Sequence, residues 1–143
     1  MNTSSTSSPA LVERINSPAF SALGLPFSEI VRAGDTLYLS GQMGTLPGTL
    51  TLAPGGLQAE ALQAMNNIKA SLEGHGYSLD HIVKCTVMLA DMADWPAFNE
   101  VYTQFFAKPY PARSAFGASG LAMGGRVEIE VLATVHAPAG PQP

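Results

Sequence analysis

Apolar residues recur at helical spacing between Gly56 and Gly74. The stripe consists of Leu57, Ala61, Met65, Ile68 and Leu72. Residues separated by three or four positions share one face of a helix, so this segment is predicted to be an amphipathic helix with one buried face. Gly74 and Gly76 supply the stop signal at its end.

A second helix is predicted to begin at Asp94. Asp is a favoured N-cap residue, and Pro96 follows in what would be the first turn. The apolar face of this helix would consist of Phe98, Val101, Tyr102 and Phe105. Pro109 and Pro111 mark its expected end.

Three other segments alternate in the manner of β-strands. Residues 36–40 place Leu residues on one face and Tyr38 and Ser40 on the other. Residues 82–89 place Val83, Cys85, Val87 and Leu89 together, and residues 127–136 place Val127, Ile129, Val131, Ala133 and Val135 together. Residues 46–56 are rich in Gly, Pro and Thr and are predicted to form a loop. The order strands, helix, strand, helix, strands predicts an α+β fold with the helices on one side of a sheet.

The second face of this sheet is predicted to be partly buried against another copy of the chain. Two helices cover only one face, yet Leu132 lies among the polar residues of the other face of the last strand. Charged residues make up only 13% of the chain, about half the usual share. Both observations favour an oligomer over a monomer.

Length and composition favour one domain over residues 11–137, with flexible tails at 1–10 and 138–143. The net charge of −4 and the absence of any Lys/Arg cluster argue against a nucleic-acid partner. Residues 1–9 contain no basic residue and no apolar core, so neither a signal peptide nor a membrane anchor is expected, and the predicted location is cytoplasmic. Cys85, the single cysteine, excludes an intrachain disulfide and is predicted to be a buried, inert thiol.

The candidate chemistry centres on Arg113 and on Glu128, which follows fifteen residues later in a predicted strand. An arginine and a carboxylate on neighbouring strands can form a structural ion pair. Alternatively, the guanidinium can bind a substrate carboxylate while the glutamate handles a proton or a water molecule. The residues alone leave these two interpretations at even weight.

Four motifs together carry a resemblance to a known family: Ser40-Gly41-Gln42, Asn99-Glu100-Val101-Tyr102 with Phe105-Phe106, Pro111-Ala112-Arg113-Ser114, and Val127-Glu128-Ile129-Glu130. In this order the chain resembles, over residues 15–137, the Rid family of reactive enamine/imine deaminases, also called YjgF and historically endoribonuclease L-PSP. The resemblance implies a chorismate-mutase-like α+β fold, with a mixed β-sheet and two helices packed on one face. It also implies a homotrimer with small-molecule clefts at the subunit interfaces.

The resemblance assigns roles to individual residues. Arg113 matches the arginine that binds the substrate carboxylate, and Glu128 matches the glutamate credited with positioning or activating water. Ser40, Gly41 and Asn99 match residues that line the cleft. Two positions depart from the family pattern: Phe27 stands where a cleft tyrosine is common, and Ala115 stands where a cysteine is often found. Loss of the tyrosine hydroxyl removes a hydrogen-bond donor, which puts the substrate preference and rate in question.

Each assignment has a purely structural alternative. Arg113 could pair with Glu128 or Glu130 and only stabilise the oligomer, and Glu128 could be a solvated carboxylate. Ser40 could be a turn residue, Gly41 a bend, and Asn99 an exposed helix residue. Phe27 and Phe116, expected in an apolar pocket wall, could belong to the ordinary core.

The leading prediction is an enzyme that hydrolyses 2-enamine/2-imine carboxylic acids to 2-keto acids and ammonia in an intersubunit cleft. It needs no cofactor, and no metal site is expected, because none of His75, His81 and His136 has ligand spacing to another His, Cys or acid. The main alternative is a protein that binds 2-keto acids or regulates without significant catalysis. An aminomuconate-type deaminase and an endoribonuclease are weaker alternatives.

Overall fold

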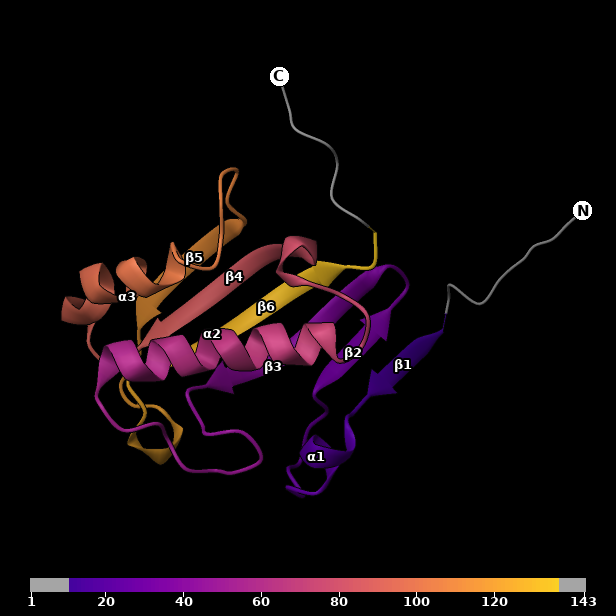
Figure 1. The fold of residues 1–143 in the computed structure, drawn as a ribbon, viewed down its shortest axis with the longest axis horizontal. Coiled ribbons are helices and arrows are strands. Elements are labelled where there is room, and N and C mark those ends of the chain that lie inside the picture. The colour runs from indigo at the N-terminus through magenta and orange to yellow at the C-terminus, as the bar shows by residue number, and fades with distance from the viewer. Residues whose placement is uncertain (1–10, 137–143) are drawn as a thin grey trace, which may run out of the picture.

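A computed structural model describes residues 11–136, which form one six-stranded sheet with helices packed on one face (Figure 1). The strands are β1 (Val12–Ile15), β2 (Ile30–Ala33), β3 (Thr36–Met43), β4 (Ile82–Leu89), β5 (Ala112–Gly117) and β6 (Val127–Thr134). The helices are α1 (Pro18–Ser21), α2 (Leu57–Glu73) and α3 (Trp95–Tyr102), with short 3-10 turns at Leu79–His81, Met92–Asp94 and Ala122–Gly124 (η5). The predicted tails and the domain boundary at residue 137 lie outside the described residues.

The strand order is β1-β2-β3-β6-β4-β5. All neighbouring pairs are antiparallel except β4 and β5, which are parallel and are connected through α3. The sheet is therefore mixed, as predicted. The expectation that Arg113 and Glu128 lie on neighbouring strands is wrong, because β4 lies between β5 and β6.

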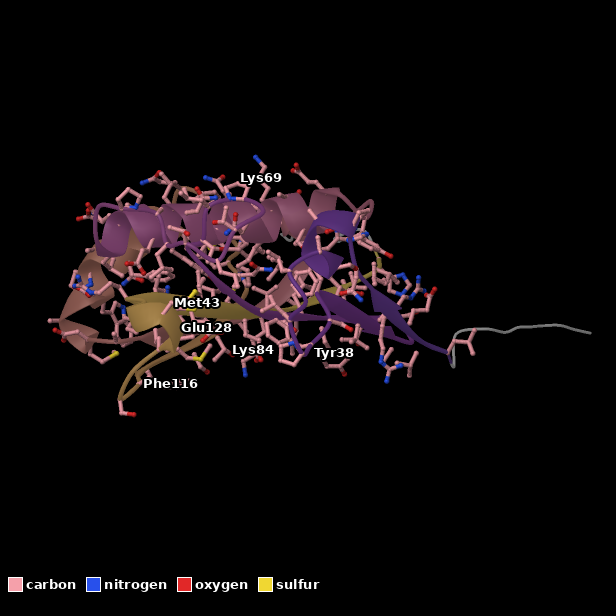
Figure 2. The ribbon with its side chains drawn as sticks, turned by 90° about the horizontal axis from the view of Figure 1, so that it is seen from below. Tyr38, Met43, Lys69, Lys84, Phe116 and Glu128 are labelled. Atoms are coloured by element: carbon pink, nitrogen blue, oxygen red, sulfur yellow. The ribbon has the colours of Figure 1, made fainter. Side chains whose placement is uncertain are left out.

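The two predicted helices are confirmed, and both lie on the same side of the sheet (Figures 1 and 2). The stripe predicted on α2 is buried, with Ile68 and Leu72 fully inaccessible to solvent. It packs on the apolar faces of β3, β4 and β6, which alternate as expected from their sequences. After α2 the chain turns at Gly76, which has a φ of +89° that a residue with a Cβ adopts only at a cost.

Three details differ from the sequence-based expectation. Val83 is 48% exposed, because the pairing of β4 with β6 shifts register just after Ile82. Helix α3 ends at Tyr102, well before the prolines, and Phe105 lies beyond it. Asp94 occupies the N-cap position, but its carboxylate accepts a hydrogen bond from Arg126 at 2.7 Å instead of capping the helix.

The N-terminal part of the fold was not predicted. Strands β1 and β2 extend the sheet beyond β3 as an antiparallel ladder, and α1 lies between them in the chain. These elements are four residues each, too short for a periodic pattern to identify them. They matter for function, because the segment between α1 and β2 carries Phe27.

The face of the sheet opposite the helices is open in the single chain (Figure 2). Tyr38 and Phe116, both labelled there, are each 48% exposed on this face, and Leu132 is only half-buried. Apolar side chains on an open sheet face are the pattern expected of a surface that another subunit covers. None of the described helices is long and apolar enough to cross a membrane.

Two leucines of α2 test how much the helix–sheet core contributes to stability. Leu72 is fully buried and Leu62 is 43% exposed. Leu72→Ala should lower the free energy of unfolding by about 3 kcal/mol, since it removes buried methyl groups and leaves a cavity. Leu62→Ala, the same chemical change, should cost less than about 1 kcal/mol. Urea unfolding at one fixed protein concentration measures both, and equal losses would contradict the packing described here.

Candidate active site

Glu128 lies on the open face of the sheet, near the start of β6. It is in register with Met88 of β4, which is in register with Phe116 of β5. Figure 2 shows the Glu128 and Phe116 side chains on the side of the sheet away from α2. Within the described residues, the Glu128 carboxylate has no salt-bridge partner.

Gly41 makes the position of Glu128 possible. The register of β3 against β6 shifts between Leu39 and Gln42, so Ser40 and Gly41 form a bulge beside Glu128. A Cβ on Gly41 would collide with the carboxylate Oε2 and come within 2.9 Å of Cδ. The glutamate therefore packs directly on the glycine backbone, and a larger residue at position 41 would push the carboxylate out of this position.

The environment of Glu128 raises its pKa above the ordinary value of 4.5. Burial is the main cause, because it disfavours the charged form, and the negative charge of Glu130 adds to it. A carboxylate with a raised pKa is a stronger base than an exposed glutamate. Its protonated form also persists to a higher pH, so it can serve as a proton donor after it has accepted a proton.

Ser40 is held by two hydrogen bonds to the segment that precedes β2. Its hydroxyl donates to the carbonyl of Ser28 at 2.6 Å, and its amide donates to the carbonyl of Glu29 at 3.1 Å. Since the hydroxyl proton is engaged, the oxygen faces any ligand as a hydrogen-bond acceptor. Within the described residues no hydrogen bond joins Ser40 to a histidine that could act as a base, so the geometry agrees with a binding residue and not with a nucleophile.

A cavity of about 380 Å³ opens beside Glu128, and we call it the glutamate cavity. Phe27, Ser40, Gly41 and Glu128 all line it. The remaining walls are largely apolar: Phe20, Leu23, Leu25, Met43, Leu50, Ala122 and Met123, with Gln42, Thr45 and Thr49. Phe27 is 49% exposed and packs edge-to-face on Phe20, with ring centroids 5.9 Å apart.

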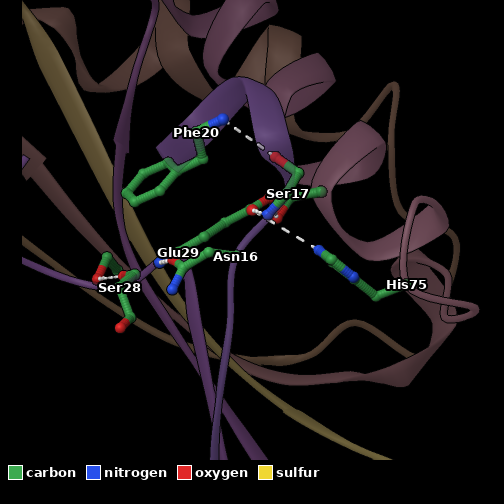
Figure 3. A network of polar contacts seen from close by, with 8 residues as sticks. Asn16, Ser17, Phe20, Ser28, Glu29 and His75 are labelled. Atoms are coloured by element: carbon green, nitrogen blue, oxygen red, sulfur yellow. Dashed lines mark hydrogen bonds and ion pairs between the residues drawn. The ribbon is translucent and has the colours of Figure 1, made fainter. Parts of the chain in front are cut away.

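A buried polar network holds the cavity wall that carries Phe27 (Figure 3). The Glu29 carboxylate accepts hydrogen bonds from the Ser71 hydroxyl at 2.6 Å and from the Ser17 amide at 2.9 Å. His75 Nε2 lies 3.6 Å from the same carboxylate. The Glu29 amide donates to Asn16 at 2.7 Å. This network ties the start of α1 and the strand β2 to the C-terminal end of α2.

Arg113 lies on the other side of the sheet. It is in register with Cys85, which is fully buried beneath the helices, and its guanidinium lies over aromatic rings of α3. Arg113 and Asn99 line a second cavity of about 340 Å³, together with Tyr102, Thr103, Tyr110 and Pro111. We call this the arginine cavity.

The six predicted site residues therefore fall into two groups. Phe27, Ser40, Gly41 and Glu128 meet at the glutamate cavity, and Arg113 and Asn99 meet at the arginine cavity. Because the two groups occupy opposite faces of the sheet, Arg113 cannot pair with Glu128 in the same protomer. Within residues 11–136, no carboxylate lies at ion-pair distance from Arg113. The structural alternative of an intramolecular ion pair is therefore wrong.

Comparison with known proteins gives a consistent result. The family model described as endoribonuclease L-PSP matches residues 17–135. The chain is 44% identical over 125 residues to the goat protein named 2-iminobutanoate/2-iminopropanoate deaminase. The aligned region covers 87% of this chain and 91% of the goat protein. The human protein of the same name is 40% identical over 126 residues, and the aligned region covers 87% of this chain and 91% of the human protein. The chain belongs to the Rid family.

The structural comparison agrees with this assignment. The crystal structure of RidA from an Antarctic Psychrobacter superimposes with a TM-score of 0.74 at 41% identity, over 78% of this chain and 89% of that one. The predicted YjgF-type fold is thereby confirmed for this Rid-family chain.

Two residues that line or support the glutamate cavity were missed by sequence reasoning. Glu29 lines neither cavity but supports the glutamate cavity through its network, and it gave no signal because its partners Ser71 and His75 are more than forty residues away in the chain. Met123, which has a left-handed φ of 61° in η5, lines the glutamate cavity and also had no recognisable pattern.

Phe116, expected in a pocket wall, lies on the open face outside the glutamate cavity. Cys85 is buried as predicted, and burial raises its pKa to about 11.

The network around Glu29 predicts a pH-dependent contribution to stability. Burial by itself would raise the pKa of Glu29, but the hydrogen bonds from Ser71 and Ser17 and the proximity of His75 outweigh it, so the pKa lies below 4.5. A lowered pKa stabilises the fold above the unfolded-state value, and this stabilisation is lost as the pH falls through the folded-state value.

Glu29→Gln should therefore lower the free energy of unfolding at pH 7 by about 1–3 kcal/mol. The difference from the wild type should shrink as the pH falls below about 4.5. Urea unfolding between pH 7 and pH 3 measures this, with Glu73→Gln, an exposed carboxylate at the C-terminal end of α2, as the control. A difference that does not depend on pH would mean that the Glu29 charge contributes nothing.

Proposed function

We propose that this protein hydrolyses 2-imino carboxylic acids, and the enamines that tautomerise to them, to 2-keto acids and ammonia. The observation that carries the proposal is the division of the site residues between two cavities on opposite faces of one protomer. A complete site requires the arginine cavity of one subunit to face the glutamate cavity of the next. The names of the curated relatives, 2-iminobutanoate/2-iminopropanoate deaminase, suggest the reaction.

An interface between two different surface patches is heterologous, and repeated copies of it form a ring when the rotation between neighbouring subunits closes. We propose a homotrimer with one site at each interface. The half-exposed Tyr38 and Phe116 on the open face support burial of that face in such an assembly. In this arrangement Arg113 and Asn99 come from one subunit, and Phe27, Ser40, Gly41 and Glu128 come from its neighbour.

The proposed reaction needs three actions from the protein. The guanidinium of Arg113 binds the substrate carboxylate through two parallel hydrogen bonds, and Asn99 lies beside it for a further polar contact. Ser40 and the backbone at Gly41 line the place of the reacting carbon. Glu128 orients a water molecule and accepts its proton as the oxygen attacks the imine carbon.

Attack of water on the carbon–nitrogen double bond gives a carbinolamine. Glu128 passes the water proton to the nitrogen as the carbinolamine forms. It then takes the proton of the carbinolamine hydroxyl and delivers it to the amine nitrogen, so that the carbon–nitrogen bond breaks, the carbon–oxygen double bond forms and ammonia leaves. The raised pKa of Glu128 suits it to both proton transfers. Every atom comes from the substrate or from water.

Replacement of Arg113 tests the proposal. An amino-acid dehydratase generates the enamine from serine or threonine, and keto-acid release is followed while semicarbazide competes for the imine. Arg113→Ala should lower kcat/KM by about 100-fold, since the loss of charge-assisted hydrogen bonds to a carboxylate costs about 3 kcal/mol. Glu128→Gln should lower kcat by about 100-fold or more, because it removes the proton acceptor.

Glu130→Gln is the matched control, since Glu130 lies two residues further along the same face of β6 and is exposed. It should retain most of the activity. Full activity in Arg113→Ala would overturn the proposal. A wild type that binds a 2-keto acid but does not accelerate keto-acid release would favour the binding or regulatory alternative. That alternative is motivated by Phe27, which gives the cavity no hydroxyl where the family commonly has a tyrosine.

Phe27→Tyr tests what that missing hydroxyl does. The half-exposed ring can accept the hydroxyl without a buried unsatisfied group, so folding should be unaffected. A hydroxyl beside the reacting centre can orient water, and we expect kcat/KM for the small imine derived from serine to rise about fivefold. Phe27→Leu, which keeps the cavity apolar, should show no such gain. Equal values for all three proteins would show that Phe27 acts only as a wall.

A further inference from the structure

The guanidinium of Arg113 lies against the aromatic face of α3. Its Cζ is 4.7 Å from the ring centroid of Tyr102 and 5.8 Å from the centroids of Phe98 and Trp95. All three distances are within the range of favourable cation–π contact. The spacing 95, 98, 102 places the three rings on one face of the helix.

These aromatic contacts take the place of a conventional partner. Within residues 11–136, Arg113 has neither a salt bridge nor a side-chain hydrogen bond to another residue. Arg126 shows the contrast, because its guanidinium is bound to the carboxylate of Asp94 at 2.7 Å. Stacking uses the flat faces of a guanidinium, whereas its N–H donors point outward in the plane. The donors of Arg113 are therefore left for a ligand.

The aromatic face is rigid where it meets the arginine. Phe98 is 1% exposed and Tyr102 is 4% exposed, so both rings are fixed by the core. Trp95 is 37% exposed and closes the outer side. A charged side chain held on fixed rings loses less conformational freedom when it binds a ligand than a free arginine does.

We propose that Trp95, Phe98 and Tyr102 are positioning residues that hold the Arg113 guanidinium by its face and present its N–H donors to the substrate carboxylate. The inference rests on the carboxylate-binding role proposed above for Arg113. It assigns a function to α3 beyond its packing on the sheet. None of the three rings needs to touch the substrate.

The ring of Tyr102, and not its hydroxyl, carries this role. The hydroxyl is buried near the Cys85 thiol and meets no partner at full hydrogen-bond geometry within the described residues. Tyr102→Phe removes an unsatisfied polar group and keeps the ring, so it is the conservative variant. Tyr102→Leu removes the aromatic face at nearly the same position. If the Leu variant does not fold, the more exposed pair Trp95→Leu and Trp95→Phe gives the same comparison.

The position of Arg113 is tested first, without turnover. The chain has four arginines, so the Nε–Hε signals in a nitrogen-15 NMR spectrum are few, and Arg113→Ala identifies the signal of Arg113. Stacking over a ring shifts the Hε resonance upfield. This shift should persist in Tyr102→Phe and shrink in Tyr102→Leu. An Arg113 signal at the position of an exposed arginine in the wild type would overturn the inference, whatever the enzyme does.

Kinetics then test what the positioning contributes. Ordering one long side chain costs about 1 kcal/mol, so Tyr102→Leu should raise KM about fivefold with little change in kcat. Tyr102→Phe should restore the wild-type KM. An unchanged KM in Tyr102→Leu and Trp95→Leu, while Arg113→Ala abolishes activity, would overturn the inference and leave the proposed function intact. No activity in the wild type, with the upfield Arg113 signal present, would overturn the proposed function alone.

Discussion

The alternation of side chains along β-strands divides the chemistry of this protein between two faces of its sheet. Arg113 is in register with buried Cys85 and points to the helix side, whereas Glu128 and Phe116 are both in register with Met88 and point to the open side. A slip of one residue in either strand would reverse the side on which its residue lies. The strand register thus decides that an arginine and a glutamate fifteen residues apart cannot serve one site within one protomer.

The glutamate cavity depends on contacts between segments that are far apart in the chain. The bulge at Ser40 and Gly41 makes room for the Glu128 carboxylate, and Ser40 is bound to the backbone of Ser28 and Glu29. Glu29 in turn is bound by Ser71 of α2. The C-terminal part of α2 therefore supports, through two hydrogen-bonded steps, the wall that carries Phe27. A rigid second layer of this kind keeps binding groups in a fixed geometry.

The two polar residues of greatest functional interest are held in different ways. Glu128 packs on a glycine backbone, and its burial raises its pKa. Arg113 lies on aromatic rings and keeps its donors free of protein carboxylates within the described residues. Among residues 11–136, both arrangements leave the charged group without an ion-pair partner that would compete with a ligand. Buried charged groups are ordinarily paired, so unpaired ones at a cavity are typical of a binding site.

The sequence by itself determined both main helices, the central strands and the family, because their periodic patterns and four motifs are local. It also named six of the residues that line the two cavities, although not their grouping. Only the tertiary structure decided that β4 separates β5 from β6, that Asp94 binds Arg126 instead of capping α3, and that Glu29 joins α1 to α2. Strand order, register shifts and polar networks arise from contacts between distant residues. No pattern within a short window of sequence contains that information.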